Sequence, residues 1–158
     1  MEIPVNDASD GRLVSFVRLD DAPFEDQNVP RSPDCSIVIV IRDRLVLLGF
    51  HHERQQWELP GGTLEAGESA HHAAIRELAE ETSITTREVS LVASAQYRFP
   101  SNANMYLAAV FALEVHSDPV LVSSDELDSF VWWDPADELF DGQCPLDAEI
   151  ARRALRST

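Results

Sequence analysis

The sequence contains no lysine, and all 12 of its basic residues are arginines. This absence excludes chemistry through a lysine Schiff base and a phosphate-binding loop of the Walker type. Recognition of phosphate would therefore depend on arginine, on backbone N–H groups and on bound metal. Cysteine is scarce as well: Cys35 and Cys144 lie far apart without metal-ligand spacing, so we expect two reduced thiols.

Positive charge is in short supply, because 28 acidic residues give the chain a net charge of −16. Such a charge disfavours nucleic-acid polymers and anionic membranes as partners, whereas a small nucleotide stays compatible because a bound cation inverts the field locally. Long apolar segments are also missing: the longest run, residues 105–113, has nine residues and is too short to span a bilayer. The acidic start shows no secretory signal, so a cytoplasmic location is expected.

A length of 158 residues fits one domain with a single sizeable core. Residues 1–33 are polar and hold four prolines, and we interpret them as an N-terminal arm. Within this arm, the alternating residues 13–19 predict an edge strand that pairs with the main sheet or with a neighbouring subunit. Residues 34–158 are expected to form the folded domain, and a homodimer is compatible with this division.

Hydrophobic patterns after residue 34 alternate between strands and helices. Strands are predicted for residues 35–41, 45–50, 87–99, 104–115 and 127–133. Helical periodicity is found in residues 70–82 and 145–156. Strands that precede, separate and follow two helices predict an α/β fold, in which a mixed sheet carries one helix on each face.

The predicted helix 70–82 carries the most informative side chains. At about 100° per residue, Glu77, Glu80 and Glu81 fall within roughly a third of its circumference. They share this face with three alanines, whereas a merely solvated acidic face would carry long polar neighbours. We therefore expect the acids to look inward, where gathered carboxylates need a counter-charge such as Mg²⁺.

The spacing around these acids resembles the Nudix box, G-x5-E-x7-R-E-U-x-E-E-x-G-U, in which U is a bulky aliphatic residue. Gly62 is followed after five residues by Glu68, and after seven more by the run from Arg76 to Ile84. Eight of the nine specified positions match, and the departure is Ser83, where the family has glycine. Because a left-handed residue often ends a helix, we expect Ser83 to strain or recap the helix end without abolishing the site.

The Nudix resemblance covers roughly residues 35–156 and implies an α/β/α sandwich that hydrolyses a diphosphate bound through divalent ions. Carried over by position, Gly61, Glu77, Glu80 and Glu81 would bind Mg²⁺, with Mn²⁺ as a substitute. Glu77 or a partner would accept the proton of the attacking water. Arg76 would orient the carboxylates from a position one turn before Glu80.

Further site residues are expected outside the helix. Many family members add an acid from a loop across the site, and Glu126 is our choice over Asp125. The alternative is that both are exposed loop acids without a role in the site. Gly62 gives the backbone freedom to approach a phosphate. Arg54 and Arg44 could bind phosphate, with simple exposure as the default for each.

Several residues keep two interpretations. Glu68 either supports the helix N-terminus or reaches the metal shell, and Ser69 is the candidate N-cap. Five aromatic residues could stack on a base but are more typical of a core: Trp57, Tyr97, Phe99, Trp132 and Trp133. The five histidines show no ligand spacing and are expected to be packing or surface residues.

The box does not specify what the diphosphate carries. A small undecorated domain favours a MutT-like enzyme that converts a (modified) nucleoside triphosphate to a nucleoside monophosphate and pyrophosphate. The alternative is an ADP-ribose or nucleotide-sugar pyrophosphatase, because Pro100 lies sixteen residues beyond Ile84, where members of that type often carry proline. A non-catalytic regulatory domain is less compatible, because such domains generally lose box carboxylates.

Overall fold

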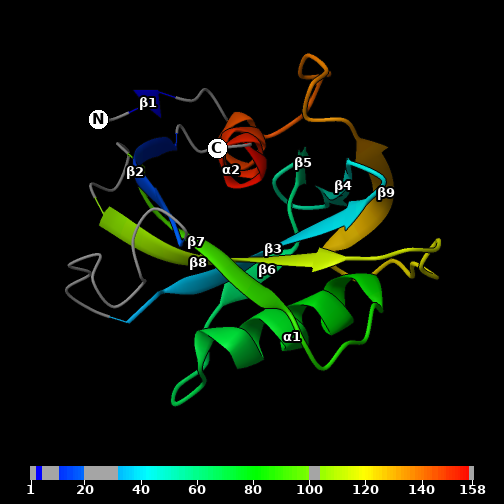
Figure 1. Ribbon diagram of the computed structural model, residues 1–158, viewed down its shortest axis with the longest axis horizontal. Helices are drawn as coiled ribbons and strands as arrows, with labels where there is room; N and C mark the ends of the chain where they lie inside the picture. Colours follow the sequence, from blue (N-terminus) through cyan, green and yellow to red (C-terminus); the bar gives the residue numbers. More distant parts are fainter. Residues whose placement is uncertain (1–2, 5–10, 20–31, 100–103, 157–158) are drawn as a thin grey trace.

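The computed structural model describes residues 3–4, 11–19, 32–99 and 104–156. Figure 1 shows its elements in chain order. They are β1 (Ile3–Pro4), β2 (Arg12–Arg18), β3 (Cys35–Arg42), β4 (Leu45–His51), β5 (Gln56–Glu58), β6 (Gly61–Thr63), α1 (Ala70–Thr82), β7 (Ser90–Phe99), β8 (Asn104–Glu114), β9 (Leu127–Trp133) and α2 (Pro145–Leu155).

Most elements lie where the hydrophobic pattern predicts them, and α1 and β9 match the predicted bounds. Strand β7 begins at Ser90 and not at residue 87, because Thr86 Oγ1 bonds to both the N–H and the C=O of Glu88 and forms a local turn. The short strands β5 and β6 occupy segments that the sequence predicts as a loop and a glycine turn.

The strands form one mixed sheet in the order β1-β2-β7-β8-β3-β4-β5, with β6 paired to β3 and β9 paired to β4. Strand β3 runs parallel to β8, and the other pairs are antiparallel. Five consecutive residues of β3, from Ser36 to Val40, are buried. A β-branched run therefore becomes a central strand because both of its faces are covered.

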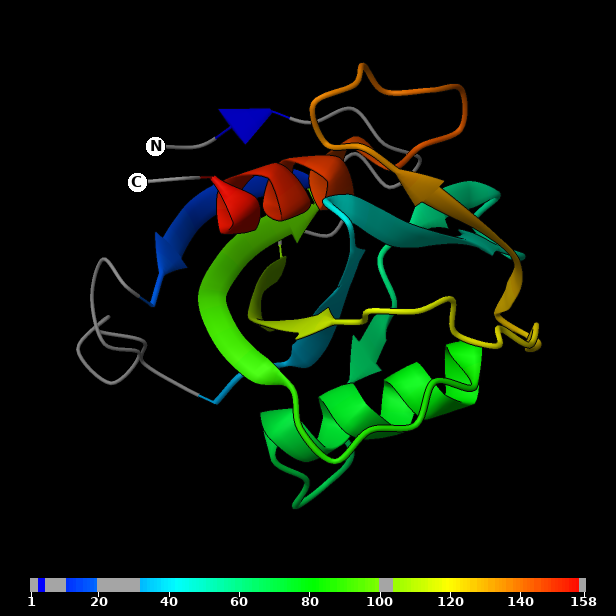
Figure 2. The same cartoon turned by 45° about the vertical axis from the view of Figure 1, so that its right-hand side comes forward.

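Two cores lie on opposite faces of the sheet, and Figure 2 shows α2 over one face and α1 over the other. Ile37 and Ile39 of β3 pack with Ile150 of α2. The intervening Val38 packs with Leu78 of α1. Because successive side chains of a strand point to opposite faces, one strand contributes to both cores. The α/β/α arrangement predicted from the sequence is confirmed.

The alternating segment near the N-terminus pairs within its own chain. Residues 12–18 form β2, which lies antiparallel to β7, with Phe16 opposite Ala95. The choice between the main sheet and a neighbouring subunit is thereby decided for this strand. A domain boundary at residue 33 stays a prediction, as does the homodimer.

Neither helix in the described part of the chain is long and apolar enough to cross a membrane. Cys35 and Cys144 are not joined by a disulfide, in agreement with the two thiols expected from the sequence. Burial raises the pKa of the Cys35 thiol to about 11, with a hydrogen bond to Tyr97 opposing the shift. The thiol is therefore protonated near neutral pH and a poor nucleophile.

Candidate active site

Both ends of helix α1 are capped by serine. Ser69 is extended, with φ −78° and ψ 158°, and its side chain accepts the N–H of His72 at 3.1 Å. The predicted N-cap is confirmed. At the other end Ser83 is left-handed, with φ 68°, and its N–H donates to the Ala79 carbonyl at 3.0 Å. The helix therefore ends in a conformation that glycine adopts with less strain.

The alanine-bearing side of α1 faces the sheet, as expected, since Ala73 and Ala74 are fully buried. The acids divide between this side and solvent. Glu81 is 4% exposed, whereas the Glu80 side chain is 59% exposed. The expectation that all three acids look inward is wrong for Glu80, because at about 100° per residue Glu80 and Glu81 lie on opposite sides of Glu77.

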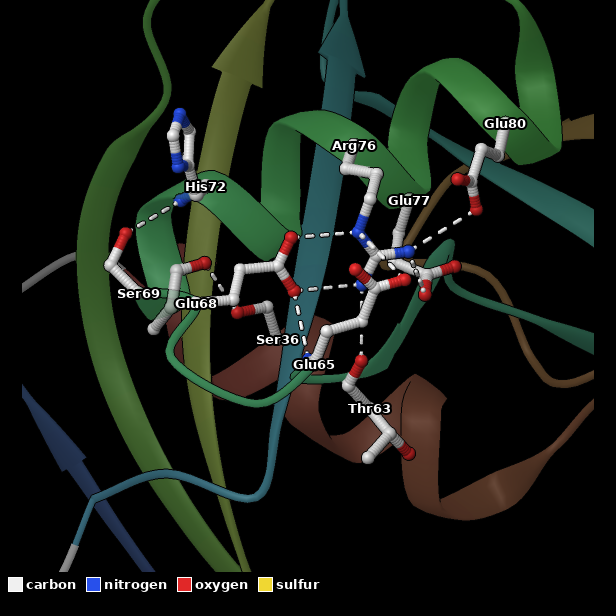
Figure 3. A network of polar contacts seen from close by, with 10 residues as sticks. Ser36, Thr63, Glu65, Glu68, Ser69, His72, Arg76, Glu77 and Glu80 are labelled. Atoms are coloured by element: carbon white, nitrogen blue, oxygen red, sulfur yellow. Dashed lines mark hydrogen bonds and ion pairs between the residues drawn. The ribbon is translucent and has the colours of Figure 1, made fainter.

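Arg76 connects the acids at the solvent side of α1, as Figure 3 shows. Its Nε and Nη2 donate to the two oxygens of Glu68 at 2.7 and 2.9 Å. Its Nη1 donates to Glu77 at 2.9 Å and to Glu80 at 3.2 Å, and Nη2 also donates to the Thr63 carbonyl at 3.2 Å. These contacts support the predicted orienting role of Arg76.

Glu68 bonds to Arg76 and does not belong to the group of inward-facing carboxylates. The hydrogen bonds from Arg76, together with the N–H of Glu65 at 3.0 Å, lower the pKa of Glu68 to about 2. Because both of its oxygens are occupied, the contacts favour the structural interpretation of this residue over the metal-shell one.

Two carboxylates of α1 and one from a distant loop meet at the inner edge of the helix. Glu77, Glu81 and Glu126 each place an oxygen so that the three atoms lie within 4.8 Å of one another. Gly61 N–H donates to Glu81 Oε1 at 2.8 Å. The loop that carries Glu126 is fixed by its carbonyl, which accepts His52 N–H at 2.8 Å. Helix, glycine turn and loop therefore converge on one point.

The electrostatics of this point disfavour three free negative charges. Burial raises the pKa of Glu81 to about 9; a hydrogen bond with Glu126 and the charges of Glu77 and Glu126 add to the shift, against the Gly61 N–H. Burial also raises the pKa of Glu77, with Arg76 opposing. Buried carboxylates of this kind need a proton or a cation.

The glycine pair before α1 is required by close approach. A Cβ on Gly62 would lie 2.4 Å from Glu77 Oε1, and one on Gly61 would lie 2.3 Å from the Ser36 carbonyl oxygen. Gly62 therefore leaves the space that the Glu77 carboxylate occupies. Substrate binding by Gly62 and metal binding by Gly61 stay predictions.

A cleft of about 1350 Å³ opens beside the carboxylates. It runs across β3, because Tyr97, Phe99 and Tyr106 line it from β7 and β8 while Arg54 and Glu58 line it from the β4–β5 side. The three aromatic ring centroids lie between 5.5 and 5.7 Å apart. The cleft thus has an aromatic end and a charged end.

Arg44 is not part of the cleft. It lies exposed, with φ 73°, in the turn between β3 and β4. The pairing of Arg42 with Leu45 places this turn at the opposite end of β3 from the pairing of Ile37 with Gly61. Its predicted role in phosphate binding is therefore withdrawn, and of the two predicted arginines only Arg54 lines the cleft.

Of the five aromatic residues predicted as candidates for base stacking, some line the cleft and the others pack elsewhere. Trp57 packs against Phe50 and Phe140, with ring centroids 5.2 and 6.1 Å away. Trp133 is 4% exposed, and the Arg42 guanidinium lies 4.3 Å from the Trp132 ring. The tryptophans are thus packing residues, whereas Tyr97 and Phe99 line the cleft. Pro100 lies outside the described residues.

Three cleft residues escaped the sequence interpretation, namely Tyr106, Glu58 and Asp147. Glu58 is 6% exposed and accepts two hydrogen bonds from Arg54 and one from Gln56. Asp147 accepts the N–H of Leu59 at 2.9 Å. An acid between Trp57 and Leu59 is a visible signal for Glu58, since an isolated charge in an apolar stretch needs a partner. Asp147 has no such signal, because its partner lies 88 positions earlier.

Comparison with known proteins begins at the level of the family. A profile of the NUDIX domain matches residues 30–156. The NAD-capped RNA hydrolase NudC of Photorhabdus laumondii is 33% identical over 133 residues, which cover 82% of this chain and 48% of that protein. The protein of the same name from Escherichia coli K12 is 29% identical over 131 residues, with the same two coverages. The chain spans about half the length of these curated relatives.

Solved structures share the fold. The Bacillus subtilis pyrophosphohydrolase BsRppH aligns with a TM-score of 0.68 at 19% identity, covering 96% of this chain and 94% of that chain. A MutT Nudix hydrolase from Burkholderia pseudomallei gives 0.66 at 23% identity, covering 80% and 100%. With most of its length matched by the NUDIX profile and its box helix in place, this chain belongs to the Nudix hydrolase family.

Proposed function

We propose that this protein hydrolyses the diphosphate bond of a nucleotide joined to a second moiety, in a reaction that requires Mg²⁺ or, as a substitute, Mn²⁺. The observation that carries the proposal is the convergence of Glu77, Glu81 and Glu126, whose oxygens lie within 4.8 Å of one another, and of these Glu77 and Glu126 line the cleft. Water attacks one phosphorus, the bridging P–O bond breaks, and two phosphate monoesters leave.

The donor set fits a hard divalent cation. Its groups are carboxylate oxygens, which Mg²⁺ prefers, and burial disfavours the negative charges of Glu77 and Glu81, as their raised pKa values indicate. A bound Mg²⁺ would neutralise the diphosphate and lower the pKa of a coordinated water. Glu80 lies outside this group, and its role as a ligand stays a prediction.

The remaining chemistry is supplied by this chain's own groups. Gly61 N–H fixes one oxygen of Glu81, and Arg76 fixes one oxygen of Glu77. Glu77 lines the cleft beside the other two carboxylates, where its free oxygen could accept a proton from a water. Glu77 would accept the proton of the attacking water, and Glu81 and Glu126 would hold the cation.

For the second moiety, we infer a nucleoside, so that the substrate is a dinucleotide of the NAD kind. The relatives named NAD-capped RNA hydrolase support this choice over the triphosphate favoured by the sequence. The cleft also supports it, because its aromatic end and its charged end lie on opposite sides of β3. Tyr97, Phe99 and Tyr106 offer ring surface to a base, and the acids lie toward the diphosphate.

A hydrolysis panel read by mass spectrometry tests the proposal. It contains NAD, NAD-capped RNA, ADP-ribose, nucleotide sugars and nucleoside triphosphates, each with and without Mg²⁺. We expect AMP and nicotinamide mononucleotide from NAD, and a loss of turnover by orders of magnitude in Glu81→Gln, with folding retained. Pyrophosphate from a triphosphate would favour the MutT-like function. Binding of nucleotides without turnover would leave the non-catalytic alternative.

A further inference from the structure

Two arginines, Arg54 and Arg76, line the cleft, and they differ in how many guanidinium N–H donors are left to bind a ligand. All three guanidinium nitrogens of Arg76 donate to groups of the protein. Arg54 uses Nε and Nη2, each at 2.7 Å from an oxygen of Glu58. A guanidinium carries five N–H donors, so three of those on Arg54 are left over. Its side chain is 51% exposed, which leaves these donors accessible.

Arg54 is held from one side by a buried acid. Glu58 is 6% exposed and also accepts Gln56 Nε2 at 2.6 Å. The backbone N–H of Arg54 donates to His51 Nδ1 at 3.2 Å. Both the main chain and the side chain of Arg54 are therefore fixed before a ligand arrives. A pre-oriented guanidinium loses little rotamer entropy when it binds an anion.

The segment that carries Arg54 is tied to the loop of Glu126. His52, two residues before Arg54, donates its N–H to the Glu126 carbonyl at 2.8 Å. Arg54 and Glu126 therefore belong to one bonded substructure at the charged end of the cleft. A diphosphate held through the carboxylates would therefore lie in the cleft that Arg54 also lines.

We propose that Arg54 binds a phosphate of the substrate and that Glu58 is the positioning residue that sets its orientation. The proposal rests on the proposed function for the identity of the ligand as a diphosphate. The chain has no lysine, and every guanidinium nitrogen of Arg76 already donates to the protein. Among the described cleft residues, Arg54 is therefore the arginine with donors left for the diphosphate. The Glu58 charge offsets that of Arg54, so recognition depends on directed hydrogen bonds more than on long-range attraction.

The test combines kinetics with the binding of inorganic pyrophosphate, measured by calorimetry without metal and with Mg²⁺. Arg54→Lys keeps the charge but loses the planar fork, and Glu58→Gln keeps the shape but loses the bidentate partner. We expect each change to raise KM about tenfold with kcat within a factor of three, and to weaken pyrophosphate binding by a similar factor. Arg87→Ala, which removes an exposed arginine elsewhere, is the matched control.

A double-mutant cycle separates positioning from general structural support. Arg54→Met alone leaves the Glu58 carboxylate buried and unpaired, so its binding is measured well below the melting temperature of this variant. The double variant Arg54→Met/Glu58→Gln, which lacks both charges, is measured beside it. If Glu58 acts through Arg54, Glu58→Gln has no further effect on KM or pyrophosphate affinity once Arg54 is absent. An equal effect of Glu58→Gln with and without Arg54 overturns the positioning role.

The outcomes for the two proposals are distinct. Unchanged KM and pyrophosphate affinity in a folded Arg54→Met/Glu58→Gln variant overturns the inference while the proposed hydrolysis stands. Loss of pyrophosphate binding in that variant, with no compound of the panel hydrolysed by the wild type, supports the inference and rejects the proposed function.

Discussion

The contact between Gly62 and Glu77 leaves no room for a methyl group. In Gly62→Ala the new Cβ would lie 2.4 Å from Glu77 Oε1, so the carboxylate must leave its place beside Arg76. We expect kcat to fall at least a hundredfold, which steady-state kinetics on the identified substrate would measure.

Gly67→Ala is the control for that substitution. No atom lies within 4 Å of its Cβ, but its φ of +78° strains an alanine. We expect a loss of about 1 kcal/mol of stability with turnover retained. Wild-type kcat in Gly62→Ala would contradict the assigned role of the Glu77 position.

Proton release should accompany metal binding. The metal-free Glu81 carboxyl, with its pKa raised to about 9, is protonated at neutral pH, whereas a metal binds the ionised form. Mg²⁺ affinity should therefore rise up to about tenfold per pH unit from 7 to 9 and then level off. Calorimetry in two buffers of different ionisation enthalpy counts the released proton. A Mg²⁺ affinity that does not change between pH 7 and 9 would count against the site.

The same shift fixes the sign of the stability change without metal. The unfolded carboxyl ionises near its ordinary pKa of 4.5, and the folded one near 9. The unfolded state thus loses its proton first, and the metal-free fold becomes less stable as pH rises through this window. Mg²⁺ should reduce that slope, which thermal melts at several pH values would show.

The site residues that could be predicted from the sequence are those whose proximity follows from their local spacing. Arg76, Glu77 and Glu81 lie within six positions of one helix, so their proximity follows from helical geometry. The partners of Glu58 were not predicted even though Arg54 is four positions away, because no helix relates them: the contact depends on how β4 returns into β5.

At the level of the element, the two serine caps of α1 make opposite predictions. Ser83→Gly relieves a left-handed φ of 68° and should raise the stability by about 1 kcal/mol, or roughly 2–4 °C in Tm. Ser69→Ala removes the acceptor of His72 N–H and should lower the stability by about the same amount. Both variants should keep kcat within a factor of two, and a large kcat loss in Ser83→Gly would show that the strain serves the chemistry.

Elements with their own periodicity could be predicted, and elements defined by a partner could not. Helix α1 shows a 3.6-residue pattern with a cap at its start, and β9 lies between acidic residues and a proline. Strands β5 and β6 have three residues each and exist because β4 and β3 lie beside them. The sequence marks the glycines of β6 as a turn but does not reveal that β6 pairs with the remote strand β3.

For the whole molecule, the net charge of −16 conflicts with a long polyanionic substrate. At low ionic strength we expect kcat/KM for free NAD to exceed that for NAD at the 5′ end of an RNA. The difference should narrow between 20 and 200 mM KCl at fixed Mg²⁺, because salt screens the repulsion. Preference for the capped RNA at low salt would show that a local surface overrides the net charge.

The hydrogen bond from Leu59 N–H to Asp147 joins residues 88 positions apart, next to the glycine turn that orients Glu81. While the chain is being synthesised, the box segment leaves the ribosome well before helix α2 exists. The turn therefore gains this hydrogen bond only when α2 docks. Fragments that stop before Asp147 would carry every box carboxylate and still lack this hydrogen bond beside the glycine turn, so we expect them to hydrolyse nucleotides more slowly than the full chain.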